Sequence, residues 1–184
     1  MTIERNVEAL AANWQGGSVG TGCMYGGHMD NNPANSLAAS TDNDNYYGTG
    51  DTAGEAAKCP FDTTDGQKAS RRTMNLSNGE VIWDFSGNVY EWTDAQCGTP
   101  WDTTAAWQEW NVAGLTDYEK YVGGPDGSYT SSNGVGKYYG CTANGNAFLR
   151  GGAWYSGADA GVAALVLNNA PSSSTTGVGF RCCK

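Results

Sequence analysis

The apolar residues of this chain occur in short runs that are separated by long polar stretches. Residues 40–70 and 123–146 are rich in Gly, Asn, Asp, Ser and Thr, which favour turns and loops. With 27 glycines among 184 residues, long regular helices are not expected. The length suits one compact core, so we expect a single domain over residues 1–184.

Two segments near the N-terminus have helical patterns. Apolar residues from Ile3 to Trp14 recur on one helical face, and Gly16-Gly17 would end that helix. The sequence Asn31-Asn32-Pro33 places a capping residue and a proline ahead of residues 34–39, which predicts a second, short helix. A further short helix is expected at Thr104–Trp110, with two tryptophans on one side.

The remaining apolar runs are typical of short strands. Residues 73–84 should form a hairpin, because Asn78-Gly79 supplies the positive φ angles of a type I′ turn. Residues 88–93 alternate as a strand does. Three more strand candidates follow near the C-terminus: Ala147–Arg150, Val162–Leu167 and Val178–Cys182. Many short strands with two helices and long loops predict an α+β fold with a small, mostly antiparallel sheet.

The charge and hydropathy of the chain argue against two classes of partner. The net charge is −9, and Lys and Arg do not cluster beyond Arg71-Arg72, whereas nucleic-acid binding needs a basic patch. No apolar run approaches the roughly 20 residues of a membrane helix. The N-terminus has no signal-peptide pattern and enters a helical pattern at once. We therefore expect no nucleic acid, no membrane insertion, and a chain that is the C-terminal part of a longer protein.

The six cysteines do not have the spacing of a zinc site. They are widely spread, and no pair of C-x-x-C motifs occurs. The adjacent Cys182 and Cys183 cannot easily pair with each other. A domain of this length does not need disulfides in order to fold. The sequence leaves open both the disulfide state and the redox compartment.

Patterns for hydrolysis and phosphate binding are missing. His28 is the only histidine, and no G-x-S-x-G motif offers it a nucleophile, so we expect a surface or hydrogen-bonding role. Carboxylates such as Asp42 and Asp44 are abundant, but no motif fixes two of them at the spacing of a glycosidase. The glycine-rich residues 16–22 lead to no Lys, which argues against a phosphate loop.

Three motifs occur in the order found in a known family. The run Ser86-Gly87-Asn88-Val89-Tyr90-Glu91-Trp92-Thr93 is similar to the "GN-V/A-W-EW-T" signature of the formylglycine-generating (sulfatase-modifying) enzymes. Residues 149–154, LRGGAW, resemble its "RGGSW", and residues 179–182, GFRC, resemble its terminal "GFRC". The resemblance implies the C-type-lectin-like fold of that family. It also implies core positions for three aromatic residues of these motifs: Trp92, Trp154 and Phe180.

The residues that carry the chemistry of that family are replaced here. The family's enzyme oxidises a substrate cysteine with two cysteines that follow "RGGS" and bind copper as thiolates. Aligned from Gly151-Gly152, these positions fall on Ser156 and Gly161. A hydroxyl and a hydrogen cannot replace soft sulfur ligands, so we expect neither copper nor this enzyme activity. The alternative is a divergent oxidase that recruits Cys182 and Cys183 at a different site.

A second family with the same scaffold fits the C-terminal segment better. In the variable proteins of diversity-generating retroelements, adenine-directed mutagenesis rewrites a C-terminal region whose template often carries AAY codons. Such codons cannot become Lys, Glu, Gln, Met or Trp. Residues 151–179 contain no Lys, Glu, Gln or Met. The resemblance implies that residues 150–184 form such a variable region.

By this resemblance the candidate diversified positions are Ala153, Tyr155, Ser156, Asp159, Ala163, Val166, Asn168, Asn169, Ser173, Thr175 and Gly177. Residues 155–159 should lie in a loop, and residues 173–177 alternate toward the last strand, so their side chains could share one face. Changeable loops on a rigid scaffold are a common way to build binding surfaces. An ordinary polar loop without function is the alternative reading of this segment.

The resemblance also implies a calcium site. In the formylglycine-generating family a structural Ca²⁺ lies at the first motif, and the matching positions here are Asp84, Gly87, Val89 and Glu91. Two carboxylates and two main-chain carbonyls are suitable oxygen ligands for Ca²⁺. The alternative is that Glu91 only caps backbone amides.

These observations together predict a hypervariable, receptor-like protein that is not an enzyme and binds a protein or glycan ligand through residues 153–177. The alternatives are the divergent oxidase, or a structural domain of a surface or virion protein. Display at a cell surface or on a virion would suit the leading hypothesis.

Overall fold

The computed structural model describes residues 3–29, 31, 34–38, 71–98, 103–111, 124–125 and 129–181. The predicted loop at residues 40–70 and Cys182, the end of the last predicted strand, lie outside these residues. The described part is mostly sheet with little helix, which confirms the predicted α+β class. None of its helices has the length and apolar character needed to cross a membrane.

The N-terminal helix is shorter than predicted. Helix α1 covers Ile3–Glu8, and the 3-10 turn η1 follows at Ala11–Asn13. The main-chain carbonyls of the last two residues of α1 accept hydrogen bonds from the side chains of Asn13 (2.8 Å) and Trp14 (2.7 Å). Side chains thus satisfy carbonyls that are left unpaired where a helix ends.

The other two predicted helices are wrong. Residues 34–38 form a bend followed by chain without regular secondary structure, and Trp107–Gln108 form the short strand β4. The side chain of Asn88 binds both the main-chain N–H and the carbonyl of Leu37, at 2.6 and 2.9 Å, so these groups are not available to a helix. Trp107 pairs with Tyr139 of a neighbouring strand, and their rings meet edge to face at 5.7 Å.

The predicted hairpin and most predicted strands are confirmed, with shifted ends. Strands β1 and β2 form the hairpin around the Asn-Gly turn. The strands are β1 Thr73–Asn75, β2 Val81–Trp83, β3 Tyr90–Gln96, β4 Trp107–Gln108, β5 Tyr138–Tyr139, β6 Ala147–Arg150, β7 Leu165–Asn169 and β8 Val178–Gly179. Only β6 has the predicted bounds, and no pattern in the sequence predicts β5.

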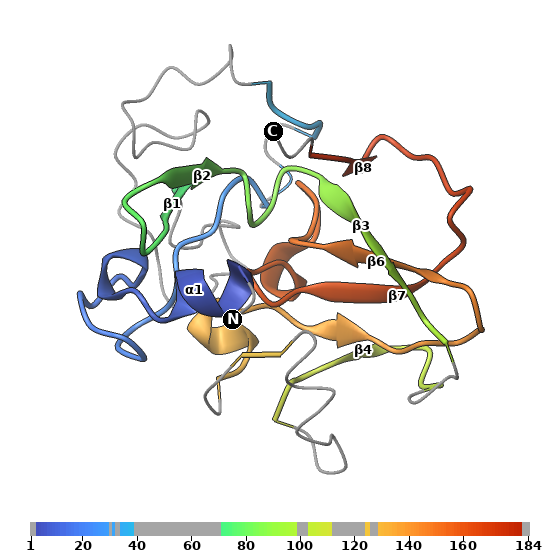
Figure 1. Ribbon diagram of the computed structural model, residues 1–184, viewed down its shortest axis with the longest axis horizontal. Helices are drawn as coiled ribbons and strands as arrows, with labels where there is room; N and C mark the ends of the chain where they lie inside the picture. Colours follow the sequence, from blue (N-terminus) through green and yellow to red (C-terminus); the bar gives the residue numbers. More distant parts are fainter. Residues whose placement is uncertain are drawn as a thin grey trace.

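The main sheet has six strands in the order β4-β5-β7-β6-β3-β8. Its central pairs β3–β6 and β6–β7 are antiparallel, as is β4–β5, whereas β5–β7 and β3–β8 are parallel. In Figure 1, β3, β6 and β7 lie side by side, while α1 and the β1–β2 hairpin lie away from them on one side. Residues 147–179 thus supply two adjacent central strands, β6 and β7, and one edge strand, β8.

Alternating residues of the strands bury two different faces of the sheet. The main core contains Phe148 of β6 and Leu165 of β7, together with Val7 and Trp14 from the N-terminal segment. The opposite face carries a smaller group, which we call the outer cluster. Its buried members are Tyr90, Leu149, Ala153 and Val166, and its half-buried members are Trp92, Trp107, Tyr139 and Val178. The period of two along each strand explains this division.

None of the three aromatic residues that the resemblance places in the core is a buried member of it. Phe180 is 77% exposed, because β8 ends at Gly179 and the ring lies beyond the sheet. Trp92 is half-buried in the outer cluster, and Trp154 is also half-buried.

A disulfide that the sequence left open joins Cys97 to Cys141, with 6.3 Å between their Cα atoms. It connects the end of β3 with the loop after β5, two strands that are separated by β6 and β7 in the sheet. The buried Cys23 thiol lies 3.7 Å from Gln15 Oε1. The other three cysteines lie outside the described residues.

Candidate ligand-binding face and candidate calcium site

The predicted diversified positions divide into two groups by exposure. The exposed or half-buried side chains are Tyr155, Ser156, Asp159, Asn168, Asn169, Ser173 and Thr175. The buried residues are Ala153, Ala163, Val166 and Gly177. Ala163 packs in the main core, whereas Ala153 and Val166 belong to the outer cluster. The buried positions cannot contact a ligand unless the surface above them moves.

Two loops of the C-terminal segment meet at Tyr155 and Gly177. A methyl group placed on Gly177 would lie 2.6 Å from Tyr155 Oη, so the tyrosine lies directly against this glycine. Tyr155 is nevertheless 48% exposed, and its ring meets that of Trp154 edge to face at 4.7 Å. The structure therefore brings the loop at 155–159 and the loop at 173–177 together, as the spacing predicts.

The hydroxyl of Ser156 has two polar contacts inside the protein. It accepts the main-chain N–H of Ala153 at 3.0 Å and lies 2.8 Å from Tyr90 Oη. Burial raises the pKa of Tyr90 to about 12, although the hydrogen bond to Ser156 acts in the opposite direction. Ser156 thus holds the turn beneath Tyr155.

Strand β7 links the variable segment to the outer cluster. Val166 faces the outer cluster, and Asn168, two residues further on, is exposed. Trp92, Trp107 and Tyr139 lie around Val166 as half-buried aromatic side chains. The sequence does not predict Trp107 and Tyr139 as members of this face, because its pattern favours a helix at Trp107 and β5 has only two residues.

Charged residues lie at the other end of the loop at 155–159. Asp159 forms an ion pair with Lys137 at 3.0 Å, and Glu109 lies 4.0 Å from the same ammonium group. Glu109 also accepts hydrogen bonds from the main-chain N–H and the hydroxyl of Ser131. Asp159 is thus held by a salt bridge that is only partly exposed.

The two positions aligned with copper-binding cysteines have different surroundings. Ser156 makes the contacts given above. At Gly161 a Cβ atom would lie 2.2 Å from the carbonyl carbon of Val135 and 2.3 Å from the main-chain nitrogen of Gly136. Any side chain at this position would require the backbone to move.

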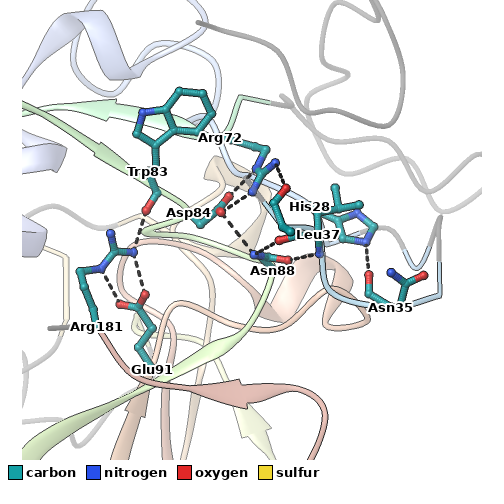
Figure 2. A network of polar contacts seen from close by, with 10 residues as sticks. His28, Asn35, Leu37, Arg72, Trp83, Asp84, Asn88, Glu91 and Arg181 are labelled. Carbon is teal, nitrogen blue, oxygen red and sulfur yellow. Dashed lines mark hydrogen bonds and ion pairs between the residues drawn. The ribbon is translucent and has the colours of Figure 1, made fainter. Parts of the chain in front are cut away.

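The predicted calcium ligand Asp84 already has a cationic partner, as Figure 2 shows. Both of its carboxylate oxygens accept hydrogen bonds from Arg72, at 2.6 Å from Nε and 2.5 Å from Nη2. One of them also accepts the side-chain amide of Asn88 at 3.2 Å. Arg72 is almost fully buried, so this pair is shielded from water.

The second predicted carboxylate ligand, Glu91, is also bound by an arginine. Arg181 donates from Nε and Nη2 to the two oxygens of Glu91, at 3.1 and 2.6 Å. The same guanidinium donates to the carbonyl of Trp83 at 2.6 Å (Figure 2). The carbonyl of Gly87 accepts the N–H of Val89 at 2.9 Å. The arrangement does not fit a cation bound by these four residues.

His28 is buried, and its Nε2 lies 3.1 Å from the carbonyl of Asn35. This agrees with the expected hydrogen-bonding role. Within the described part of the chain, no group of three or more His, Cys, Asp or Glu side chains could hold a metal ion.

Comparison of the chain with family models, with curated proteins and with solved structures finds no match. What the chain does has to be inferred from its own residues.

Proposed function

We propose that this chain is a hypervariable, receptor-like ligand-binding protein, of the kind found in diversity-generating retroelements, built on a C-type-lectin-like scaffold of the formylglycine-generating subtype. One observation carries the proposal: exposed or half-buried polar and aromatic side chains lie on two loops in contact, at 155–159 and 173–177, while residues 160–167 between them are buried. Two further exposed or half-buried positions, Asn168 and Asn169, end strand β7. We assign direct ligand contacts to Tyr155, Asp159, Asn168, Asn169, Ser173 and Thr175. The buried positions Ala153, Ala163, Val166 and Gly177 would act from beneath this surface.

The backbone beneath these loops does not depend on the proposed contact side chains. Gly151 accepts hydrogen bonds from the N–H groups of Gly87 and Gly161, and it donates to the carbonyl of Ala164. Gly152 has a φ of 90°, and a Cβ there would lie 2.4 Å from Cβ of Ala160. Because main-chain contacts hold this region, changes at the exposed positions should cost little stability.

The surface suits a protein or glycan ligand. Tyrosine and tryptophan offer large contact areas with few rotatable bonds, and both are enriched at binding surfaces. Tyr155 is the one aromatic residue of the two loops and is 48% exposed. The half-buried rings of Trp92, Trp107 and Tyr139 lie on the face of the sheet that carries the outer cluster. The net charge of −9 argues against nucleic acid.

The divergent oxidase remains the alternative with a defined test. The lack of space for a side chain at Gly161 favours binding over copper chemistry at the aligned positions. The purified chain should neither bind Cu(I) stoichiometrically nor oxidise a cysteine-containing peptide. Stoichiometric Cu(I) binding with turnover would establish the oxidase instead.

A pair of displayed libraries tests the binding surface. The first library randomises the six contact positions named above. The second randomises exposed positions elsewhere: Ala9, Ala12, Ser18, Val19, Asp94 and Ala105. Both libraries are selected against the same panel of purified proteins and immobilised glycans.

The first library should stay folded and yield specific binders to several panel members, and the second should yield few or none. Equal yields from both, or loss of folding in the first, would show that these positions are not a binding surface. If replacing the whole segment 153–177 leaves every binding partner unchanged, the chain is a structural domain.

A further inference from the structure

The turn between β2 and β3 contains unusual backbone conformations. Asp84, Gly87 and Asn88 all have positive φ angles, of 51°, 85° and 65°. For residues other than glycine such angles are unfavourable unless the surroundings hold them. This turn therefore needs strong contacts from outside its own backbone.

Arg72 makes the first of these contacts. It binds both oxygens of Asp84 and reaches the carbonyl of Ala38 at 3.5 Å from Nη1. Asn88 connects Asp84 to both main-chain groups of Leu37. The Arg72–Asp84 pair thus connects the residue before β1 with the turn and, through Asn88 and Leu37, with the segment at 34–38 (Figure 2).

Arg181 makes the second contact, from the C-terminal end of the described chain. By binding Glu91 and the carbonyl of Trp83, it joins the residues on both sides of the turn. A planar guanidinium can bind both oxygens of a carboxylate and still donate to a third acceptor, which a Lys side chain cannot do in the same geometry.

The charges at this turn balance without a metal. Two carboxylates face two guanidinium groups, so a divalent cation would add two positive charges beside Arg72 and Arg181 and would have to displace both. We propose that these two arginines take the place of a structural cation, and that the domain folds without Ca²⁺. This inference does not rest on the proposed function. If this inference and the proposed function are both correct, ligand binding through the loops at 155–159 and 173–177 is insensitive to chelators.

Thermal unfolding tests this role with the full chain. The wild type should have the same midpoint in millimolar CaCl2 and in excess EDTA. Arg72→Met should lower the midpoint strongly, because it leaves a shielded carboxylate unpaired. Arg181→Met should lower it less, since that pair is more exposed. Lys137→Met, which removes an ion pair away from the turn, is the matched control and should have a small effect.

A double variant separates charge pairing from packing. Arg72→Met with Asp84→Asn should unfold at a higher temperature than Arg72→Met alone, because no unpaired carboxylate is left. If Arg72→Met does not fold, the comparison of the wild type in CaCl2 and EDTA still decides the question.

Terbium luminescence gives a second readout on the wild type, with Tb³⁺ as a probe for calcium sites. We expect no saturable signal at this turn. Two results together would contradict the inference. The first is that Ca²⁺ raises the wild-type unfolding midpoint or that Tb³⁺ binds saturably. The second is that Asp84→Asn or Glu91→Gln abolishes this effect while the control Asp94→Asn keeps it. The inference also fails if both arginine variants are as stable in EDTA as the wild type.

Discussion

Single side chains in this domain often take roles that belong to the backbone elsewhere. Asn88 pairs with both main-chain groups of Leu37 as a strand neighbour would. Ser156 completes the turn after Ala153, and Asn13 closes the end of α1. These contacts explain how short elements and long loops can form one stable structure, since buried main-chain groups need partners.

Position 161 has room for a glycine but not for a side chain. We predict that Gly161→Ala lowers the free energy of unfolding by about 3 kcal/mol or more, because its methyl group would overlap the backbone at 135–136. Urea unfolding measures this loss. The control Gly98→Ala, where a Cβ meets no atom within 4 Å, should change stability by less than about 0.5 kcal/mol. Equal stability of the two variants would mean that the backbone at 135–136 lies further away.

The buried hydroxyl of Tyr90 should make stability fall at high pH. Its pKa is raised to about 12 in the folded protein from 10.0, so between these values the unfolded chain has lost a proton that the folded chain keeps. Stability is therefore lost as the pH rises above 10, at about 1.4 kcal/mol per pH unit at most. The comparison is urea unfolding of the wild type and Tyr90→Phe from pH 9 to 12. Parallel curves would show that Tyr90 does not contribute.

At the scale of elements, local patterns predicted only what local residues decide. The hairpin at 73–83 and strand β6 followed from turn chemistry and alternation. The helix expected at residues 34–39 is absent from the described residues 34–38, because the distant Asn88 binds that segment. Trp107 is in a strand because it pairs with Tyr139 of β5. Such pairings depend on contacts between distant residues, which one sequence does not reveal.

The candidate site was predictable to a similar extent. The spacing of the residues predicts that the loops at 155–159 and 173–177 share one face, and Tyr155 and Gly177 of these loops are in contact. The burial of Val166 was not foreseen, since β7 begins three residues later than the predicted strand. The sequence also does not predict the arginine partners of Asp84 and Glu91. Arg72 lies outside the segment 84–91 that contains these carboxylates, and Arg181 belongs to the motif at the C-terminal end.

The disulfide should stabilise the pairing of strands that are not neighbours. Cys97 and Cys141 are 44 residues apart, and closing a loop of that length corresponds to about 4 kcal/mol of unfolded-state entropy. We predict that the double variant Cys97→Ser with Cys141→Ser loses stability of this order in urea unfolding. A reductant should destabilise the wild type and leave the double variant unchanged. If the reductant has no effect on the wild type, the bond does not form.

On the scale of the whole molecule, stability and proposed binding are carried by different parts. The main core lies between the N-terminal segment and one face of the sheet. The candidate contacts lie on the loops that follow β6 and β7, and on the last two residues of β7. The arginine–carboxylate pairs hold the turn between β2 and β3, and the close backbone contacts of the glycines at 151, 152 and 161 hold the chain beneath the candidate loops. A surface built in this way can change its side chains and keep its fold.

The DNA around the coding sequence tests the central claim most directly. Sequencing this locus should reveal a near-copy of the stretch that encodes residues 150–184, beside a gene for a reverse transcriptase. The two copies should differ only where the near-copy has adenine, mainly in the codons of the candidate diversified positions. A locus without such a copy and without a reverse transcriptase, or differences spread evenly over all bases, would contradict the proposed diversified binding surface.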